Sequence, residues 1–150
     1  MDAREYFENV RAAQRGIDRR LAVMQSMRAR EQVRAQRYDA VGKGAHGTDS
    51  MRTTDDRIDY ERRSAAEVSE LRREVEDGRE VCAGVREANP GKRWGDVLEL
   101  RYCEDLTLQE TAGELGVSVR SVQADLAAAL DWVSFAGIAC ARQGRGSADL

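Results

Sequence analysis

The sequence predicts an all-α protein: an N-terminal antiparallel helical hairpin, coiled-coil-like, followed by a C-terminal helix-turn-helix domain of three helices. Three observations predict this fold class. Charged residues make up 34% of the 150-residue chain and aromatic residues 5%, which favours long helices with narrow apolar seams over one large core. The chain contains a single proline, Pro90. Apolar residues recur at helical spacing, and no segment shows the alternation expected of a strand.

The first predicted helix covers about residues 2–39. This segment has no proline and one glycine, and its apolar residues are separated by alternating steps of three and four positions, with Gln14 filling one place. The residues in this seam are Phe7, Val10, Ile17, Leu21 and Met24. Such spacing places them on one narrow stripe of a helix.

A flexible loop is predicted at about residues 41–55, VGKGAHGTDSMRTTD, because three glycines and clustered Thr and Asp residues interrupt the helical pattern. Gly42-Lys43-Gly44 lacks the G-K-[ST] that follows a strand in phosphate-binding loops, so no such loop is expected. His46 has no second metal ligand beside it in the sequence, and we expect it to be inert.

The second predicted helix covers about residues 56–88, with apolar residues at near-heptad spacing and Gly78 as a weak point in the seam. Residues 1–40 carry nine arginines against six acids, whereas residues 56–89 carry seven against ten, giving +3 and −3. Opposite charges and matched seams predict that the two helices pair as an antiparallel hairpin. The alternative is that one or both helices pair with another subunit.

The turn signal Asn89-Pro90-Gly91 marks the predicted domain boundary. The hairpin therefore occupies residues 1–89, the helix-turn-helix domain residues 90–142, and a disordered tail residues 143–150. The domain is expected to begin with a helix from Trp94 to about Glu104. The apolar stretch at 132–140, WVSFAGIAC, fits either packing onto the helix-turn-helix or a dimer contact.

Residues 108–126, LQETAGELGVSVRSVQADL, have the layout of a helix-turn-helix. The first helix crosses the second at Ala112, where a larger side chain would separate the two. Gly116 can adopt the positive φ that ends a helix. Ser118 can cap the second helix by accepting a backbone N–H, and this helix is expected to continue through Val133. Such a unit usually places its second helix in the major groove of DNA.

Composition excludes several other classes of protein. Three widely spaced cysteines without a C-x-x-C pair, and one histidine, argue against a zinc site or a disulfide framework, so we expect reduced cytoplasmic thiols. No apolar run has the length of a signal peptide or a membrane span. We expect no cofactor, no metal and no enzymatic activity, because the acids are spread along helix faces and do not converge.

The longer segment at 94–130 resembles the C-terminal DNA-binding region of bacterial sigma factors, which reads the −35 promoter element. The matching pieces are V-L-x-L-R-Y at 97–102, the acidic break before Leu106-Thr107-Leu108, ETAGELGVS at 110–118 and V-x-x-x-L at 122–126. The whole layout also resembles short phage and prophage sigma-factor-like proteins related to late-gene transcription regulators. Such proteins lack the sigma region that melts the −10 element, so this chain is not expected to act as a complete sigma factor.

The resemblance implies that Thr107 caps a helix whose N-terminus contacts a phosphate, and that residues 118–124 face the bases. Arg120 suits guanine and Gln123 suits adenine, with Ser121 beside them. The other polar and basic residues of the set given below would contact the DNA backbone. The complete set of expected DNA-binding residues is Lys92, Arg93, Thr107, Gln109, Ser118, Val119, Arg120, Ser121, Gln123 and Ala124.

The charge of this region departs from the sigma pattern. Residues 90–135 contain four basic residues against eight acids, and Asp125 and Asp131 oppose Arg120 on the second helix. Affinity for DNA depends on how many phosphates the basic side chains neutralise. A single copy of this protein should therefore bind DNA weakly and lose binding steeply as the salt concentration rises. Stable binding is then expected to need dimerisation or a partner.

The expected function is a sequence-specific, cytoplasmic DNA-binding transcription regulator of phage or mobile-element type. Its expected partners are double-stranded DNA, RNA polymerase and a second copy bound through the N-terminal helices. The alternative is a protein-interaction module that docks on RNA polymerase or another protein and has little or no DNA binding of its own.

Overall fold

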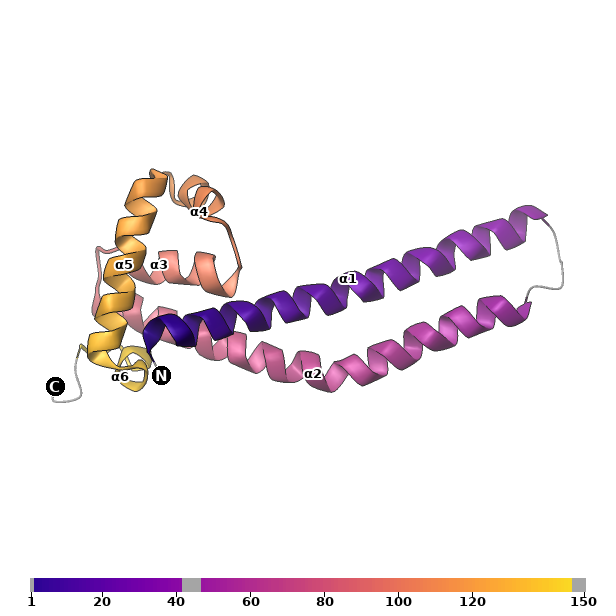
Figure 1. The fold of residues 1–150 in the computed structure, drawn as a ribbon, viewed down its shortest axis with the longest axis horizontal. Coiled ribbons are helices and arrows are strands. Elements are labelled where there is room, and N and C mark those ends of the chain that lie inside the picture. The colour runs from indigo at the N-terminus through magenta and orange to yellow at the C-terminus, as the bar shows by residue number, and fades with distance from the viewer. Residues whose placement is uncertain (1, 42–46, 147–150) are drawn as a thin grey trace. The chain divides into compact units, whose positions relative to one another are not determined.

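The structure is a computed structural model that describes residues 2–41 and 47–146. Its helices are α1 (Ala3–Val41), α2 (Gly47–Ala88), α3 (Trp94–Leu98), α4 (Leu108–Leu115), α5 (Val119–Ala136) and α6 (Ile138–Arg142) (Figure 1). A π-helical turn, η1 (Glu99–Cys103), follows α3 directly. No strand occurs in the described ranges, and the all-α fold class is confirmed. Lys43 and His46, on which two sequence-based expectations rest, lie outside the described residues.

Contacts divide the chain into two compact units, and both long helices contribute to each unit. Unit 1 comprises Met1–Arg15 and Leu71–Leu150, and unit 2 comprises Gly16–Glu70. The beginning of α1 and the end of α2 thus belong to the same unit as the C-terminal helices. The predicted boundary near residue 90 lies two residues after the end of α2 and within unit 1, so it does not separate these two units.

In unit 2, ion pairs between α1 and α2 show that these helices run antiparallel. Arg20 Nη2 lies 2.6 Å from Glu67 Oε2, and Arg28 Nη2 lies 2.9 Å from Glu61 Oε1. The residue number on α2 falls as the number on α1 rises, which is the pairing of an antiparallel hairpin. In each pair one side chain is mostly exposed and the other is partly exposed, so each pair contributes less than about 1 kcal/mol to stability.

The predicted loop at 41–55 was too long, because α2 already begins at Gly47. Side-chain bonds join the two helices near this end of α2. Arg34 Nη1 donates to the hydroxyl of Thr53, and Thr54 is hydrogen-bonded to the carboxylate of Glu31. Threonine has a low intrinsic helix propensity, and both of these threonines are thus bonded to α1.

Unit 1 has a buried aromatic contact between α1 and η1. Phe7 is fully buried, and its ring stacks on that of Tyr102 with centroids 5.4 Å apart and planes at 30°. Beside it, α1 approaches α2 closely at Gly78, where an added Cβ would lie 2.8 Å from Val10 Cγ1. A side chain at residue 78 would therefore force Val10 to shift, so Gly78 allows the close approach of the two helices.

Part of the stretch at 132–140 packs within unit 1, because Val133 and Ala136 are buried whereas Phe135 is exposed. α5 ends at Ala136, and α6 lies so close to α2 that a Cβ on Gly84 would be 1.8 Å from the carbonyl oxygen of Ala141. Beyond α6, Arg145 N–H donates to Cys140 O at 2.9 Å. The predicted disordered tail was thus placed too early at residue 143, and residues 147–150 lie outside the described ranges.

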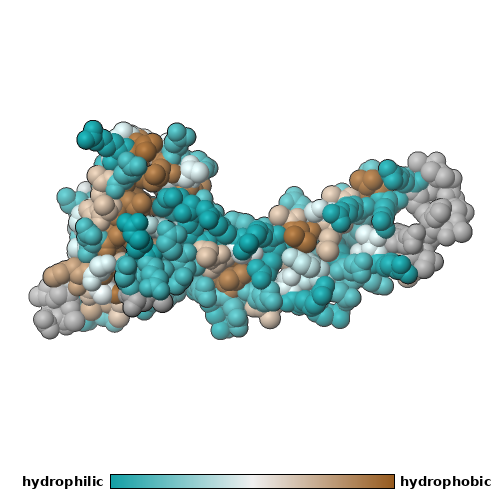
Figure 2. All heavy atoms as spheres, in the orientation of Figure 1, coloured by the Kyte–Doolittle hydropathy of each residue, from teal (hydrophilic) through white to brown (hydrophobic). Residues whose placement is uncertain are grey.

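Hydrophilic side chains cover most of α1 and α2 on the face drawn in Figure 2, whereas hydrophobic ones gather over α4 and α5. Within the described residues, no helix is both long enough and apolar enough to span a membrane. Phe135 on α5 is the most exposed large hydrophobic side chain among those described, at 77%.

Candidate nucleic-acid interface

A complete capping box starts α4. Thr107 Oγ1 accepts a hydrogen bond from Glu110 N–H at 3.1 Å, and the Glu110 carboxylate accepts from Thr107 N–H at 3.2 Å. The next side chain, Thr111, is fully buried and donates to Thr107 O at 2.8 Å. Two of the backbone N–H groups left free at a helix start are thereby satisfied, which fixes where α4 begins.

The turn between α4 and α5 depends on the backbone of Gly116. This residue has φ 65° and ψ 33°, the left-handed conformation that ends a helix, and no heavy atom would crowd a Cβ there within 4 Å. Glycine is therefore favoured at this position because the backbone is left-handed, and not because neighbouring atoms leave no room for a side chain. The Val117 N–H donates to Ala112 O at 3.1 Å and closes the turn.

Ser118 caps α5, as the sequence predicts. Its Oγ accepts from Ser121 N–H at 3.1 Å and donates to Ser121 Oγ at 3.0 Å. Behind the cap, Val97, Ala112 and Val122 form a buried cluster that joins α3, α4 and α5. The partly buried side chains packed on this cluster are Leu108, Leu115, Val117, Val119 and Leu126. The relative position of α4 and α5 is thus fixed by one small apolar core.

The first two turns of α5 divide into an exposed and a covered side. Arg120, Gln123 and Ala124 are exposed, whereas Ser121 is half-buried and Val119 packs on the apolar cluster. Arg120 has no ion-pair partner among the described residues. The exposed side of α5 therefore presents one unpaired cation and one free amide, together with the small side chain of Ala124.

The basic residues before α3 are engaged with other side chains. Arg93 Nε donates to Asp125 Oδ2 at 2.8 Å, and Lys92 Nζ lies 5.7 Å from the centroid of the Trp94 ring. Asp125 therefore pairs with Arg93 and does not pair with Arg120. The sequence could not show this pairing, because the two residues are 32 positions apart.

Two arginines of α1 hold the loop before α4. Arg11 Nε lies 2.6 Å from Asp105 Oδ1 and Arg15 Nε lies 2.9 Å from Asp105 Oδ2, while Asp105 itself has a φ of 55°. Burial acts to raise the pKa of the Asp105 carboxyl, but hydrogen bonds and positive charge from Arg11 and Arg15 outweigh it and hold that pKa below its usual value. From the same side, Arg101 Nη1 donates to Leu106 O at 2.7 Å.

The sequence did not reveal the roles of Arg11, Arg15 and Arg101. It also did not reveal the arginines that pair with acids in residues 90–135. Arg86 Nε lies 2.9 Å from Asp96 Oδ1, and Arg86 Nη2 lies 2.8 Å from Glu99 Oε2. Arg79 Nη1 lies 3.2 Å from Glu99 Oε1. Four of the eight acids between residues 90 and 135 are therefore paired with arginine, three of them with arginines of α1 or α2. The local field is less negative than the sequence of this region suggests.

Within the described ranges, no group of three or more His, Cys, Asp or Glu side chains could hold a metal ion. The three cysteines are free thiols, and Cys82 and Cys103 are fully buried. A hydrogen bond with Cys103, together with burial, raises the pKa of the Cys82 thiol. This thiol is therefore protonated near neutral pH and a poor nucleophile.

Residues 95–133 match the family model described as sigma-70, region 4. The matched segment includes nearly all of α3, then η1, α4 and most of α5, and it covers about a quarter of the chain. Comparisons with curated proteins and with solved structures gave no match. The segment is similar to sigma-70 region 4 and has the helix-turn-helix layout that suggests DNA binding and a role related to transcription.

Proposed function

We propose, from the sigma-70 region 4 match, that the protein is a sequence-specific DNA-binding transcription regulator of phage or mobile-element type. In this proposal α5 lies in the major groove and α4 crosses the DNA backbone. The observation that carries it is the exposed, unpaired Arg120 and Gln123 close to the capped start of α5. Residues 90–142 form the DNA-binding part, and residues 1–89 form the hairpin that assists it.

The proposed roles follow from the chemistry of each side chain. Arg120 can bond the O6 and N7 atoms of guanine, and Gln123 can bond the N6 and N7 atoms of adenine. The proposed base-facing surface is completed by Ser118, Val119, Ser121 and Ala124. Backbone phosphates are bound by Thr107, Gln109 and Lys92, which position the helix without reading sequence, and Arg93 can join them only when it leaves Asp125.

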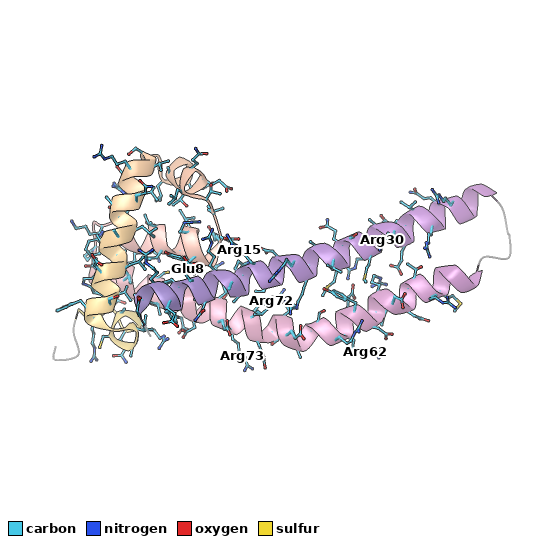
Figure 3. All side chains as sticks on the ribbon, viewed as in Figure 1. Glu8, Arg15, Arg30, Arg62, Arg72 and Arg73 are labelled. Atoms are coloured by element: carbon cyan, nitrogen blue, oxygen red, sulfur yellow. The ribbon has the colours of Figure 1, made fainter. Side chains whose placement is uncertain are left out.

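The test is the binding of Arg120→Ala to a duplex that the protein has selected from a random library. Loss of a bidentate contact should weaken specific binding by about 1–3 kcal/mol and relax the preference at one guanine. Arg72→Ala is the matched control, because Arg72 is an exposed arginine on α2 outside the helix-turn-helix (Figure 3). Equal effects of the two substitutions would mean that Arg120 contributes only charge.

A second candidate function is docking on a protein, with RNA polymerase as the proposed partner. It is favoured by Phe135, which is 77% exposed on α5, and by the pairing of Arg93 with Asp125, which removes a cation from the DNA-facing side. Exposed aromatic side chains often act as anchors in protein interfaces. In this case Phe135→Ala should abolish capture of purified RNA polymerase while Arg120→Ala leaves it unchanged.

The proposal includes a homodimer formed through the N-terminal helices and a cytoplasmic location. Within the described part of unit 2, few apolar side chains are buried: Ile17 and Val68 are covered, whereas Leu21, Val33 and Ile58 are exposed. A second copy could cover the exposed ones and bring two helix-turn-helix domains onto one DNA site. Sedimentation equilibrium gives the test, because a dimer predicts twice the monomer mass at micromolar concentration.

A further inference from the structure

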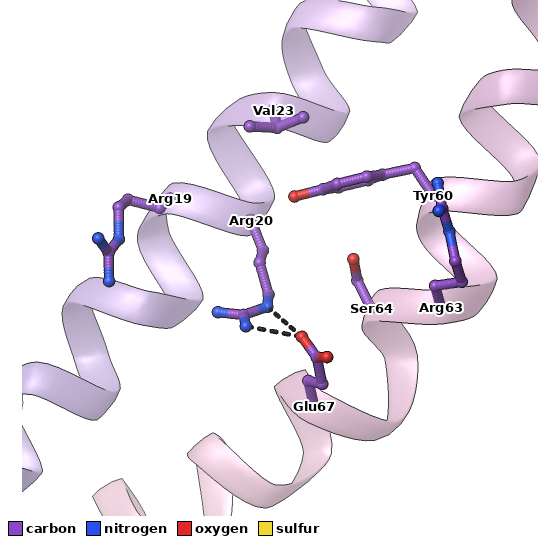
Figure 4. A pocket seen from close by; sticks show the side chains of 7 residues that line it. All are labelled: Arg19, Arg20, Val23, Tyr60, Arg63, Ser64 and Glu67. Atoms are coloured by element: carbon purple, nitrogen blue, oxygen red, sulfur yellow. Dashed lines mark hydrogen bonds and ion pairs between the residues drawn. The ribbon is translucent and has the colours of Figure 1, made fainter.

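Cationic side chains line a groove between α1 and α2 in unit 2, but they do not converge on one point. Arg20 is already paired with Glu67, and the guanidinium groups of Arg19 and Arg63 point away from the space between the helices (Figure 4). The groove therefore does not present its charges to a common ligand. The reactive side chains that the proposed function leaves unused are the cysteines, and all three belong to unit 1.

Two of these thiols form a contact between α2 and η1. Cys82 lies on α2, Cys103 is the last residue of η1, and both are fully buried. The two thiols are hydrogen-bonded to each other, so their sulfur atoms are in direct contact. Cys103 Sγ also lies against the preceding turn of α2, because a Cβ on Gly78 would be 3.4 Å from it. Contact between the sulfur atoms is the first requirement for a disulfide.

The surroundings of the pair give the two thiols different reactivity. The hydrogen bond with Cys82 lowers the pKa of the Cys103 thiol, and the positive charge of Arg79 acts in the same direction. Burial and the acids Glu99 and Glu104 oppose this shift without cancelling it. Because a thiolate attacks an oxidant and a thiol does not, Cys103 is the sulfur that reacts first. Cys82 stays protonated beside it.

The same contact lies next to the helices of the helix-turn-helix domain. Residues 104–106 join Cys103 to Thr107, which caps α4. The carbonyl oxygen of Cys82 lies against α3, because a Cβ on Gly95 would be 2.7 Å from it. A π-helical turn inside a helix often occurs at a functional site. Movement of either cysteine is therefore transmitted to a helix of the domain.

We propose that Cys82 and Cys103 form a peroxide-sensitive switch that changes the position of α4 and α5 and thereby controls DNA binding. Hydrogen peroxide transfers one oxygen to the Cys103 thiolate, giving a sulfenic acid and hydroxide, which takes up a proton as water. Cys82 then attacks this sulfur, the S–S bond forms, and the sulfenic oxygen leaves with the Cys82 proton as a second water. Two thiols and one peroxide thus give one disulfide and two waters. The effect on DNA rests on the proposed function, whereas the disulfide does not.

The disulfide changes the geometry of this contact. An S–S bond of about 2 Å is much shorter than a hydrogen-bonded contact between two thiols. Both side chains are fully buried in a close-packed core, so the end of η1 must move toward α2 when the bond forms. The cap at Thr107 and α4 follow this movement. The oxidised protein is therefore expected to bind DNA more weakly than the reduced protein.

The first arm of the test identifies the disulfide after the full chain has been treated with hydrogen peroxide without denaturant. Once free thiols are blocked, trypsin places the three cysteines on three separate peptides, residues 80–86, 102–120 and 121–142. Mass spectrometry should find 80–86 joined to 102–120, and dithiothreitol should separate them. Cys140→Ala is the matched control, because it removes the half-buried third cysteine and should leave this link unchanged. Cys82→Ala and Cys103→Ala should each abolish it.

The second arm measures fluorescence anisotropy of a labelled duplex that the protein has selected. Oxidised Cys140→Ala should bind about tenfold more weakly than its reduced form, which corresponds to the loss of one base contact, and dithiothreitol should restore the affinity. Cys82→Ala, with helix content retained, should bind equally before and after peroxide. A linked pair without a change in affinity, no linked pair, or a link that forms only in urea would overturn the switch.

Failure of the proposed function gives a different result, because the reduced protein would then bind no selected duplex. In that case hydrogen exchange at residues 104–125 tests the movement of α4 and α5 directly. Altered exchange in oxidised Cys140→Ala, reversed by dithiothreitol and absent in Cys82→Ala, would support a conformational switch without DNA as its target. Unchanged exchange would overturn it.

Discussion

The pairing of Arg93 with Asp125 makes a quantitative prediction about DNA affinity. The two side chains are joined at 2.8 Å, with 46% of the Arg93 side chain and 20% of the Asp125 side chain exposed. Asp125→Asn removes the acid from α5 and releases Arg93 to contact a phosphate. Because the pair is partly exposed, the change should cost less than about 1 kcal/mol of stability.

The magnitude follows from counterion release. One additional phosphate contact steepens the dependence of log K on log salt by about 0.9, so a fourfold dilution of salt, from about 200 to 50 mM, should favour the variant by about 3.5-fold over the parent protein. Fluorescence anisotropy of a labelled duplex at the two salt concentrations measures this ratio. The assay should be run below saturation, so that the affinity and not the stoichiometry sets the signal.

Asp131→Asn is the matched control for this prediction. Asp131 is exposed further along the same helix and has no ion-pair partner among the described residues, so its loss removes the same charge without releasing an arginine. The reasoning fails if Asp131→Asn steepens the salt dependence as much as Asp125→Asn, or if neither changes it. Either result would show that Arg93 does not reach a phosphate.

Three further changes test the local structure. Thr107→Ala removes the capping-box acceptor and should lower the free energy of unfolding by about 1 kcal/mol in urea titrations, with no change in the urea dependence. Gly116→Ala should cost about 1–2 kcal/mol by the same measurement, although nothing crowds its Cβ, because the left-handed backbone opposes a side chain. The pKa of Asp105 is lower in the folded state than in the unfolded chain. Its bonds with Arg11 and Arg15 therefore stabilise the fold at any pH above the ordinary carboxyl pKa. This contribution is lost as the pH falls through the lowered pKa of the folded state. Asp105→Asn should therefore show a smaller loss of melting temperature than the parent protein on acidification from neutral pH.

Local chemistry explains what could be predicted from the sequence. The turn at Gly116 and the cap at Ser118 each depend on residues within a few positions, and both are present in the structure, as is the cap at Thr107 that the sigma resemblance implies. The all-α class followed in the same way from helical spacing. Such features need no knowledge of which distant segments come together.

The features that could not be predicted from the sequence depend on tertiary contacts. Gly78 is explained only by the approach of Val10, which is 68 positions away, and the partner of Asp125 only by the placement of Arg93. The bond of Thr53 to Arg34 likewise joins residues of two different helices. A single sequence contains these residues but carries no signal of their pairing.

Selection of bound fragments from a random duplex library, repeated at two salt concentrations, tests the central claim most directly. Reading of base edges by α5 predicts an enriched motif that survives the higher salt and loses its guanine preference in Arg120→Ala. A palindromic motif would further indicate a dimer. No enrichment even at low salt would contradict sequence-specific binding and favour docking of the sigma-like domain on a protein.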